Sequence, residues 1–151
     1  MTKKIWEEIN FFLMVAHNFL QTKIENRETK LAHAITRVTK SLMRPAKKRT
    51  QMIEDIEVEL AIEEDGKLLR DEKGALQFSR ANELKRLKRI RAIDDMEFEF
   101  QTHWATSLPE DLSQEEKNAF EGFVIEPATS QSNGGTAGTT EEKVQKKKQN
   151  E

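Results

Sequence analysis

Four of the six residues in the stretch DDMEFE, at residues 94–99, are acidic. Carboxylates at this density can hold the two metal ions with which nucleases cleave phosphodiester bonds. The stretch also alternates, because an apolar residue occupies every second position from Met96 to Phe100, with a glutamate at each position between them. Such alternation is typical of a strand with one buried and one solvated face. We therefore expect a strand over residues 96–100 whose carboxylates face water.

Histidine, the commonest metal ligand, occurs at three positions, His17, His33 and His103. None of these lies three or four residues from another, the spacing that places two ligands on one helical turn. The sequence also contains no cysteine, no tyrosine, no phosphate-binding loop, no dinucleotide fingerprint and no nucleophile elbow. We expect no metal site, no cofactor and no catalytic residue, and hence a protein that is not an enzyme.

Two basic runs are the candidate nucleic-acid contacts, RPAKKRT at residues 44–50 and ELKRLKRIR at residues 83–91. Lysine and arginine at this density bind phosphate without sequence preference. The residues of this candidate basic patch are Arg44, Lys47, Lys48, Arg49, Lys85, Arg86, Lys88 and Arg89.

An acidic block competes with phosphate for these cations, because residues 54–65 contain seven acids and no base. The sequence pI near 6.0 is also far below that of typical nucleic-acid-binding domains. We expect a helix over residues 51–64 to lie antiparallel to a helix over residues 80–93, with opposite charges paired. Nucleic acid is therefore the less favoured partner.

The elements that must position these groups are mainly helices. Apolar residues recurring every three or four positions predict helices over residues 5–24, from about 26 to 64, and over 80–93. Pro45 removes one backbone donor, so it is expected to kink or split the second helix. Ser79 is suited to cap the third helix, and a capping box formed by Ser113 and Glu116 is expected to begin a short last helix.

The strands complete the predicted fold. KLLR and ALQF flank the turn DEKG, which predicts a small hairpin over residues 67–78 that the strand over 96–100 extends. The predicted class is mainly α (α+β), with long helices packed as a helical hairpin and a small antiparallel β-hairpin or three-stranded sheet. One α-rich domain over residues 1–126 is expected, followed by a flexible polar tail over residues 127–151.

The most apolar stretch, INFFLMVAHNFL at residues 9–20, falls within the first predicted helix. Charged residues on both sides of it exclude the length of apolar chain that a membrane span needs. Three of its side chains, Phe11, Met14 and Val15, lie off the main apolar stripe. We expect these three to contact a partner, either another copy of the chain or another protein of a larger complex.

The order of these elements is similar to that of a family of small tailed-bacteriophage proteins without an assigned role. The similarity runs over about residues 10–126 and includes the segments NFLQTKIENRETKLAHAITRVTK, DDMEFEF and LPEDLSQEEKNAFEGFVIE. It implies a phage-encoded structural or virion-assembly accessory protein, located in the virion or the host cytoplasm, whose partners are other virion or assembly proteins. Two alternatives remain open: a nucleic-acid-associated phage protein that uses the basic helices, and a host-takeover factor that binds a bacterial protein.

Overall fold

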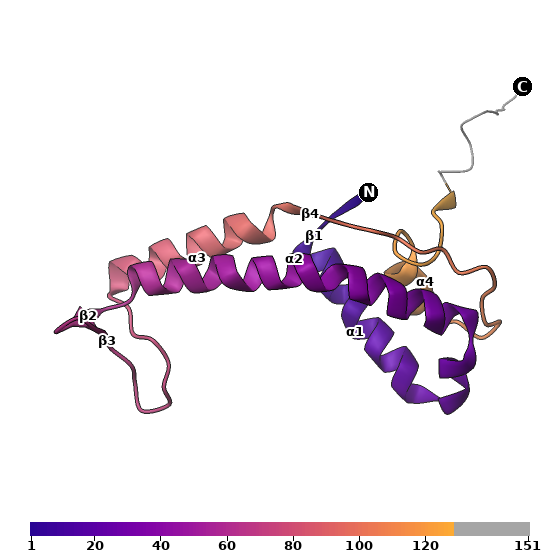
Figure 1. Cartoon of the computed structure of the whole chain (residues 1–151), viewed down its shortest axis with the longest axis horizontal. Helices are drawn as coiled ribbons and strands as arrows, with labels where there is room; N and C mark the ends of the chain where they lie inside the picture. The colour runs from indigo at the N-terminus through magenta and orange to yellow at the C-terminus, as the bar shows by residue number, and fades with distance from the viewer. Residues whose placement is uncertain (129–151) are drawn as a thin grey trace, which may run out of the picture. The chain divides into compact units, whose positions relative to one another are not determined.

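The computed structural model describes residues 1–128 and shows four α-helices and four short strands in that part of the chain (Figure 1). In chain order the elements are β1 (Thr2–Ile5), α1 (Trp6–Thr22), the 3₁₀ helix η1 (Ile24–Glu28), α2 (Lys30–Leu60), β2 (Glu63–Glu64), β3 (Lys67–Leu68), α3 (Arg80–Asp94), β4 (Glu97–Phe100) and α4 (Gln114–Phe120). The predicted α-rich α+β class is confirmed. None of the helices within residues 1–128 is long and apolar enough to cross a membrane.

The chain forms two compact units, and each unit is built from two separate segments. Unit 1 comprises Met1–Asn10 and Lys40–Gln101, and the described part of unit 2 comprises Phe11–Thr39 and residues 102–128. Helices α1 and α2 therefore each contribute residues to both units. The single domain over residues 1–126 stays a prediction, and the predicted tail, apart from Pro127 and Ala128, lies outside the described residues.

In unit 1, β4 pairs antiparallel with β1, with Thr2 opposite Phe100 and Ile5 opposite Glu97. The expected alternation along β4 is present, because Phe98 and Phe100 are buried while the glutamates are exposed. The expected extension of the predicted hairpin by this strand is wrong, because β4 pairs with β1 in a two-stranded sheet. Residues 67 and 68, in the first arm of the predicted hairpin, pair instead with residues 63 and 64 in a second two-stranded sheet. Residues 2–5 were expected to lie at or before the start of the first helix. The strand β1 was not predicted, because four residues carry too little periodicity to reveal a strand.

Between α2 and α3 the chain makes two tight turns. The first joins β2 to β3 through Asp65 and Gly66, whose φ values of 53° and 78° fit a type I′ hairpin turn. The second is the predicted DEKG turn, in which the Asp71 carboxylate accepts backbone hydrogen bonds from Lys73 and Ala75 at 2.8 and 2.9 Å. The arms of this second turn pair antiparallel through residues 70 and 76, as expected.

Helix α2 runs without interruption through Pro45, so of the expected kink or split, the split is wrong. A proline inside a helix removes one hydrogen bond, and the burial of Leu42, Ile56 and Leu60 on the same helix offsets part of that loss. The C-terminal half of α2 lies beside α3 (Figure 1), and the order of their contacts is antiparallel, as predicted. Helix α2 ends at Leu60, four residues before the predicted end.

Helix α3 begins where Ser79 caps it, because the Ser79 side chain accepts a hydrogen bond from the backbone of Asn82. Its apolar residues recur at every third position, at Leu84, Leu87, Ile90 and Ile93, and a buried apolar face was expected from them. Only Ile93 is buried, whereas Leu84 and Leu87 are exposed. Each residue of a helix turns by about 100°, so apolar residues spaced strictly by three drift by about 60° at every step. The four apolar positions therefore span too wide an arc for α2 to cover.

Unit 2 is organised around an aromatic cluster. Phe12 stacks on Phe123 with ring centroids 4.5 Å apart, and its ring meets the edge of Phe120 at 5.9 Å. Phe19 contacts Phe120 in the same edge-on manner. The backbone of His103 and of residue 105 donates hydrogen bonds to residues 123 and 124, which holds these two segments together. Phe120, Phe123 and Val124, at and just after the end of α4, are buried.

Candidate functional site

A groove in unit 1 lies between α2 and the strands β1 and β4 and has a volume of about 990 Å³. Its basic residues are Lys3, Arg44, Lys47 and Lys48. Two exposed carboxylates of β4, Glu97 and Glu99, line it as well, and its apolar lining includes Met52, Met96 and Phe98. The groove therefore offers both charges beside apolar surface, which is the composition of many protein interfaces.

The predicted basic patch divides into paired and unpaired residues. Arg49 binds Asp94 at 2.9 Å and lies 4.6 Å from the ring centroid of Trp6. Arg86 binds Glu57 at 3.1 Å and Glu83 at 2.9 Å, and Arg89 binds Glu59 at 2.8 Å. The expected pairing of the basic run on α3 with the acidic block over residues 54–65 therefore holds for Arg86 and Arg89, whereas the partner of Arg49 lies outside that block. The hydrogen bond from Arg89 lowers the pKa of the Glu59 carboxyl.

The other five residues of the predicted patch are exposed and form no ion pair within residues 1–128. They are Arg44, Lys47, Lys48, Lys85 and Lys88. The first three line the groove, whereas Lys85 and Lys88 are on α3 and do not. The eight predicted residues thus do not form one continuous patch.

The acidic stretch at residues 94–99 does not gather its carboxylates at one point. Asp94 is bound to Arg49, and Asp95 is the C-cap of α3. Glu97 and Glu99 project from the exposed side of β4 into the groove. Within residues 1–128 no group of three or more His, Cys, Asp or Glu residues is placed to hold a metal ion.

Two of the histidines meet in unit 2, which the sequence did not predict. The rings of His33 and His103 make an edge-on contact with their centroids 5.5 Å apart, while His17 is exposed elsewhere on α1. No pattern in the sequence signals this contact, because the two residues belong to segments that only the tertiary fold brings together.

The three predicted partner-contact residues differ in exposure. Met14 is 57% exposed and Phe11 is partly exposed, but Val15 is only 5% exposed, so its predicted position outside the core is wrong. The buried face of α1 includes residues 12, 15, 16 and 19. Compared with the predicted stripe, this face is rotated about the helix axis so that it includes Val15. Leu13, which belongs to the same apolar stretch and was expected to be buried, is only partly buried.

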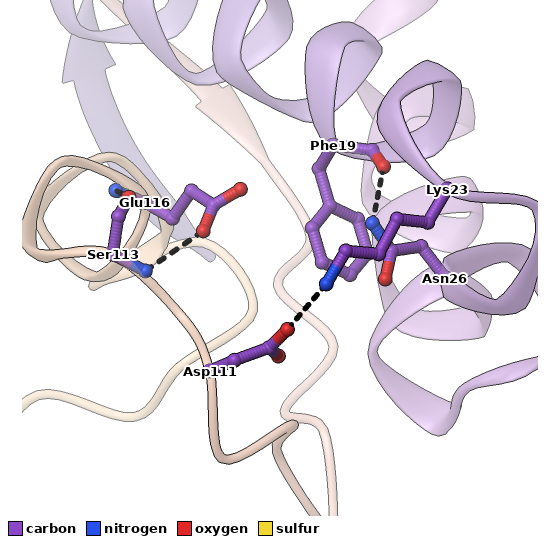
Figure 2. A network of polar contacts seen from close by, with 6 residues as sticks. All are labelled: Phe19, Lys23, Asn26, Asp111, Ser113 and Glu116. Carbon is purple, nitrogen blue, oxygen red and sulfur yellow. Dashed lines mark hydrogen bonds and ion pairs between the residues drawn. The ribbon is translucent and has the colours of Figure 1, made fainter.

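A polar network fastens the end of α1 to the segment before α4 (Figure 2). Lys23 Nζ lies 2.7 Å from a carboxylate oxygen of Asp111, and Asn26 donates a 2.7 Å hydrogen bond to the backbone carbonyl of Phe19. The hydrogen bond between the side chains of Lys23 and Asp111 lowers the pKa of Asp111 and raises the pKa of Lys23. Through the backbone carbonyl of Phe19, the network is linked to the aromatic cluster.

Comparison of the chain with protein-family models, with curated proteins and with solved structures finds no match.

Proposed function

We propose that the chain is a non-enzymatic bacteriophage structural or virion-assembly protein that acts through contacts with other proteins. The observation that carries the proposal is the groove of unit 1. There, cations that form no ion pair within residues 1–128 lie together with exposed carboxylates and apolar side chains. Protein partners present both charges and apolar side chains, so they can match all three kinds of group at once. The phage origin is inferred from the similarity of the sequence pattern over residues 10–126.

Quantitative mass spectrometry of purified particles tests this proposal. A fixed copy number of the chain per particle, or its presence in purified assembly intermediates, is the expected result. Absence from particles and intermediates, combined with recovery of the chain on a bacterial enzyme, would contradict it and favour the host-takeover interpretation.

A pair of variants connects that measurement to the groove. Changing Glu97→Lys together with Glu99→Lys reverses the charge of β4 in the groove without altering buried residues. We expect this variant to enter particles less efficiently than the wild type. Glu63→Lys with Glu64→Lys, at exposed positions of β2 that do not line the groove, is the matched control.

Nucleic-acid binding is the second candidate function, because the groove cations Arg44, Lys47 and Lys48 have no ion-pair partner within residues 1–128. It is less favoured because Glu97 and Glu99 line the same groove and repel phosphate. Binding to DNA that falls steeply with salt concentration and disappears on Lys47→Ala with Lys48→Ala would support this second candidate.

A further inference from the structure

The face of α2 that points away from the core of unit 1 carries an ordered set of exposed residues. We call this set the α2 stripe; its members are Arg44, Lys47, Lys48, Gln51, Glu54, Asp55 and Val58, and all of them are exposed. Their spacing of three and four residues keeps them on one side of the helix. Buried residues of the same helix, such as Pro45 and Ile56, occupy the opposite side.

Charge along the α2 stripe is distributed symmetrically about Gln51. The three bases precede Gln51 and the two acids follow it. Lys48 and Glu54 each lie three residues from Gln51, whereas Lys47 and Asp55 each lie four residues from it. If a second α2 lies antiparallel with its Gln51 opposite this one, each lysine therefore meets an acid of the other helix.

The helix cannot neutralise these charges by itself. Opposite charges support each other on one helix at separations of three or four residues, but Lys47 and Glu54 are seven residues, or about 10 Å, apart. Arg44 and Lys48, which are four residues apart, carry the same charge and repel each other. Asp55 accepts a hydrogen bond from Gln51 at 3.0 Å, and none of the five charged members forms an ion pair within residues 1–128.

We propose that the α2 stripe is a self-recognition surface, which binds the α2 stripe of a second copy of this chain antiparallel about a twofold axis through Gln51. A twofold contact brings the same surface of both copies together, and it requires the self-complementary pattern that the stripe has. This proposal rests on the proposed function, which assigns the surface to contacts with proteins. It adds that the partner is a second copy of this chain.

Charge sets the orientation of this contact, and neighbouring apolar side chains add the surface that it buries. Exposed ion pairs individually contribute little to binding but strongly disfavour arrangements that place like charges together. A parallel arrangement would place lysine against lysine, so only the antiparallel one is permitted. Met52 and Met96 line the groove beside the basic half of the stripe, and Val58 is 53% exposed at its other end.

Sedimentation equilibrium of the full chain at about 0.1 M salt, over a range of concentrations, tests the proposal. A concentration-dependent dimer is expected for the wild type. Lys47→Glu with Lys48→Glu makes the stripe mostly acidic, and Glu54→Lys with Asp55→Lys makes it wholly basic. We expect each double variant to weaken dimerisation about tenfold or more, because like charges then face each other.

The matched control is Lys85→Glu with Lys88→Glu, which makes the same charge change at exposed positions of α3. This control is expected to dimerise like the wild type. Circular dichroism confirms that each variant is folded, and Lys47→Gln with Lys48→Gln replaces any reversal variant that is not.

Mixing the two stripe variants provides the decisive measurement. An acidic stripe and a basic stripe attract each other, so an equal mixture should form a heterodimer although neither variant forms a homodimer. The fourfold variant that exchanges the charges at residues 47, 48, 54 and 55 should recover the homodimer.

A wild-type chain that stays monomeric, or stripe variants that dimerise unchanged, would overturn the proposal. A monomer whose binding to DNA depends on Lys47 and Lys48 but not on Glu54 would overturn it in favour of a phosphate-binding surface. If the chain is nevertheless found in particles, either result contradicts only the self-recognition proposal and leaves the proposed function intact. Failure of the one proposal can therefore be told apart from failure of the other.

Discussion

At the scale of single residues, the burial of α1 changes sharply from one position to the next. Phe12 is fully buried and contacts two other rings, whereas Met14, two residues later, is largely exposed. Side chains of similar hydrophobicity in the same short stretch therefore have different roles. Truncation of Phe12 removes core contacts, and truncation of Met14 alters only surface.

We predict that Phe12→Ala lowers the free energy of unfolding by about 3 to 5 kcal/mol, as truncations of buried aromatic residues do. Met14→Ala is the control and should change it by less than about 0.5 kcal/mol. Urea titration followed by circular dichroism measures both values. Equal losses for the two variants would show that the aromatic cluster does not form the core of unit 2.

The Lys23–Asp111 pair predicts how stability depends on pH. The pKa of Asp111 is lowered in the folded protein, mainly by its hydrogen bond with Lys23, so the pair stabilises the fold above the ordinary pKa of a carboxyl group. This stabilisation disappears as the pH falls through the lowered pKa and Asp111 becomes protonated. The pKa of Lys23 is raised, so a second loss occurs when the pH rises through that value and the ammonium group deprotonates.

Comparison of the wild type with Asp111→Asn isolates this pair. The difference between their melting temperatures should be largest near pH 7 and should shrink toward zero as the pH is lowered past the carboxyl range. The difference is expected to be small, because both side chains are more than half exposed. A difference that stays constant at acidic pH would contradict the assigned role of the carboxylate.

At the scale of elements, the capping box holds the short helix α4 in place. Ser113 accepts a hydrogen bond from the backbone of Glu116, and the Glu116 side chain accepts one from the backbone of Ser113 at 2.8 Å (Figure 2). Because α4 has only seven residues, few other interactions fix its first turn. At its other end the helix carries Phe120 into the aromatic cluster.

We predict that Ser113→Ala lowers the free energy of unfolding by about 0.5 to 2 kcal/mol, the usual cost of losing a helix cap. Ser107→Ala, at an exposed position outside any helix, should have almost no effect. Thermal unfolding measures the two variants, and a Ser113→Ala protein as stable as Ser107→Ala would contradict the importance of the cap.

The helix pair of unit 1 predicts unequal roles for two arginines. Arg49 binds Asp94, covers the ring of Trp6 and has a side chain that is 21% exposed, whereas the Arg89 side chain is 43% exposed. We expect Arg49→Ala to cost about 1 to 3 kcal/mol, because it removes both an ion pair and a cation–π contact. Arg89→Ala should be nearly neutral. Urea unfolding of the two variants, followed by tryptophan fluorescence, checks this order.

Elements stabilised by neighbouring residues were predictable from the sequence, and contacts between distant segments were not. The caps at Ser79 and Ser113 and the alternation along β4 follow from residues within a few positions of each other. The pairing of β1 with β4 and the His33–His103 contact join residues at least 70 positions apart. The groove combines residues of β1, α2 and β4, which are far apart in the sequence. Its α2 residues were recognised as part of a basic run and its β4 residues as part of an acidic strand, but no local pattern indicated that they lie together.

At the scale of the whole molecule, each unit closes by joining an early segment to a late one. In unit 1 the closure is the pairing of β1 with β4, and in unit 2 it is the contact of α1 with Phe120 and Phe123. The residues between α2 and α3 fold locally, because their turns pair neighbouring strands.

We predict that deletion of residues 1–5 lowers the free energy of unfolding by about 2 to 4 kcal/mol, since β4 then loses several backbone hydrogen bonds. Trp6, whose ring meets the edge of Phe98, reports on the loss through its fluorescence. Lys3→Ala, which keeps the strand and changes one exposed side chain, is the control. Equal stability of the deletion and the control would contradict the role of β1 in closing unit 1.

During synthesis, the N-terminal rings of the aromatic cluster in unit 2 are made long before their C-terminal partners. About 100 residues separate Phe19 from Phe120, and a ribosome that adds roughly 5 to 20 residues per second needs about 5 to 20 s to make them. Throughout that interval Phe12 and Phe19 have been translated, but their ring partners do not yet exist. The nascent chain therefore presents an uncovered aromatic surface to chaperones and to neighbouring nascent chains, and the completion of α4 ends that exposure.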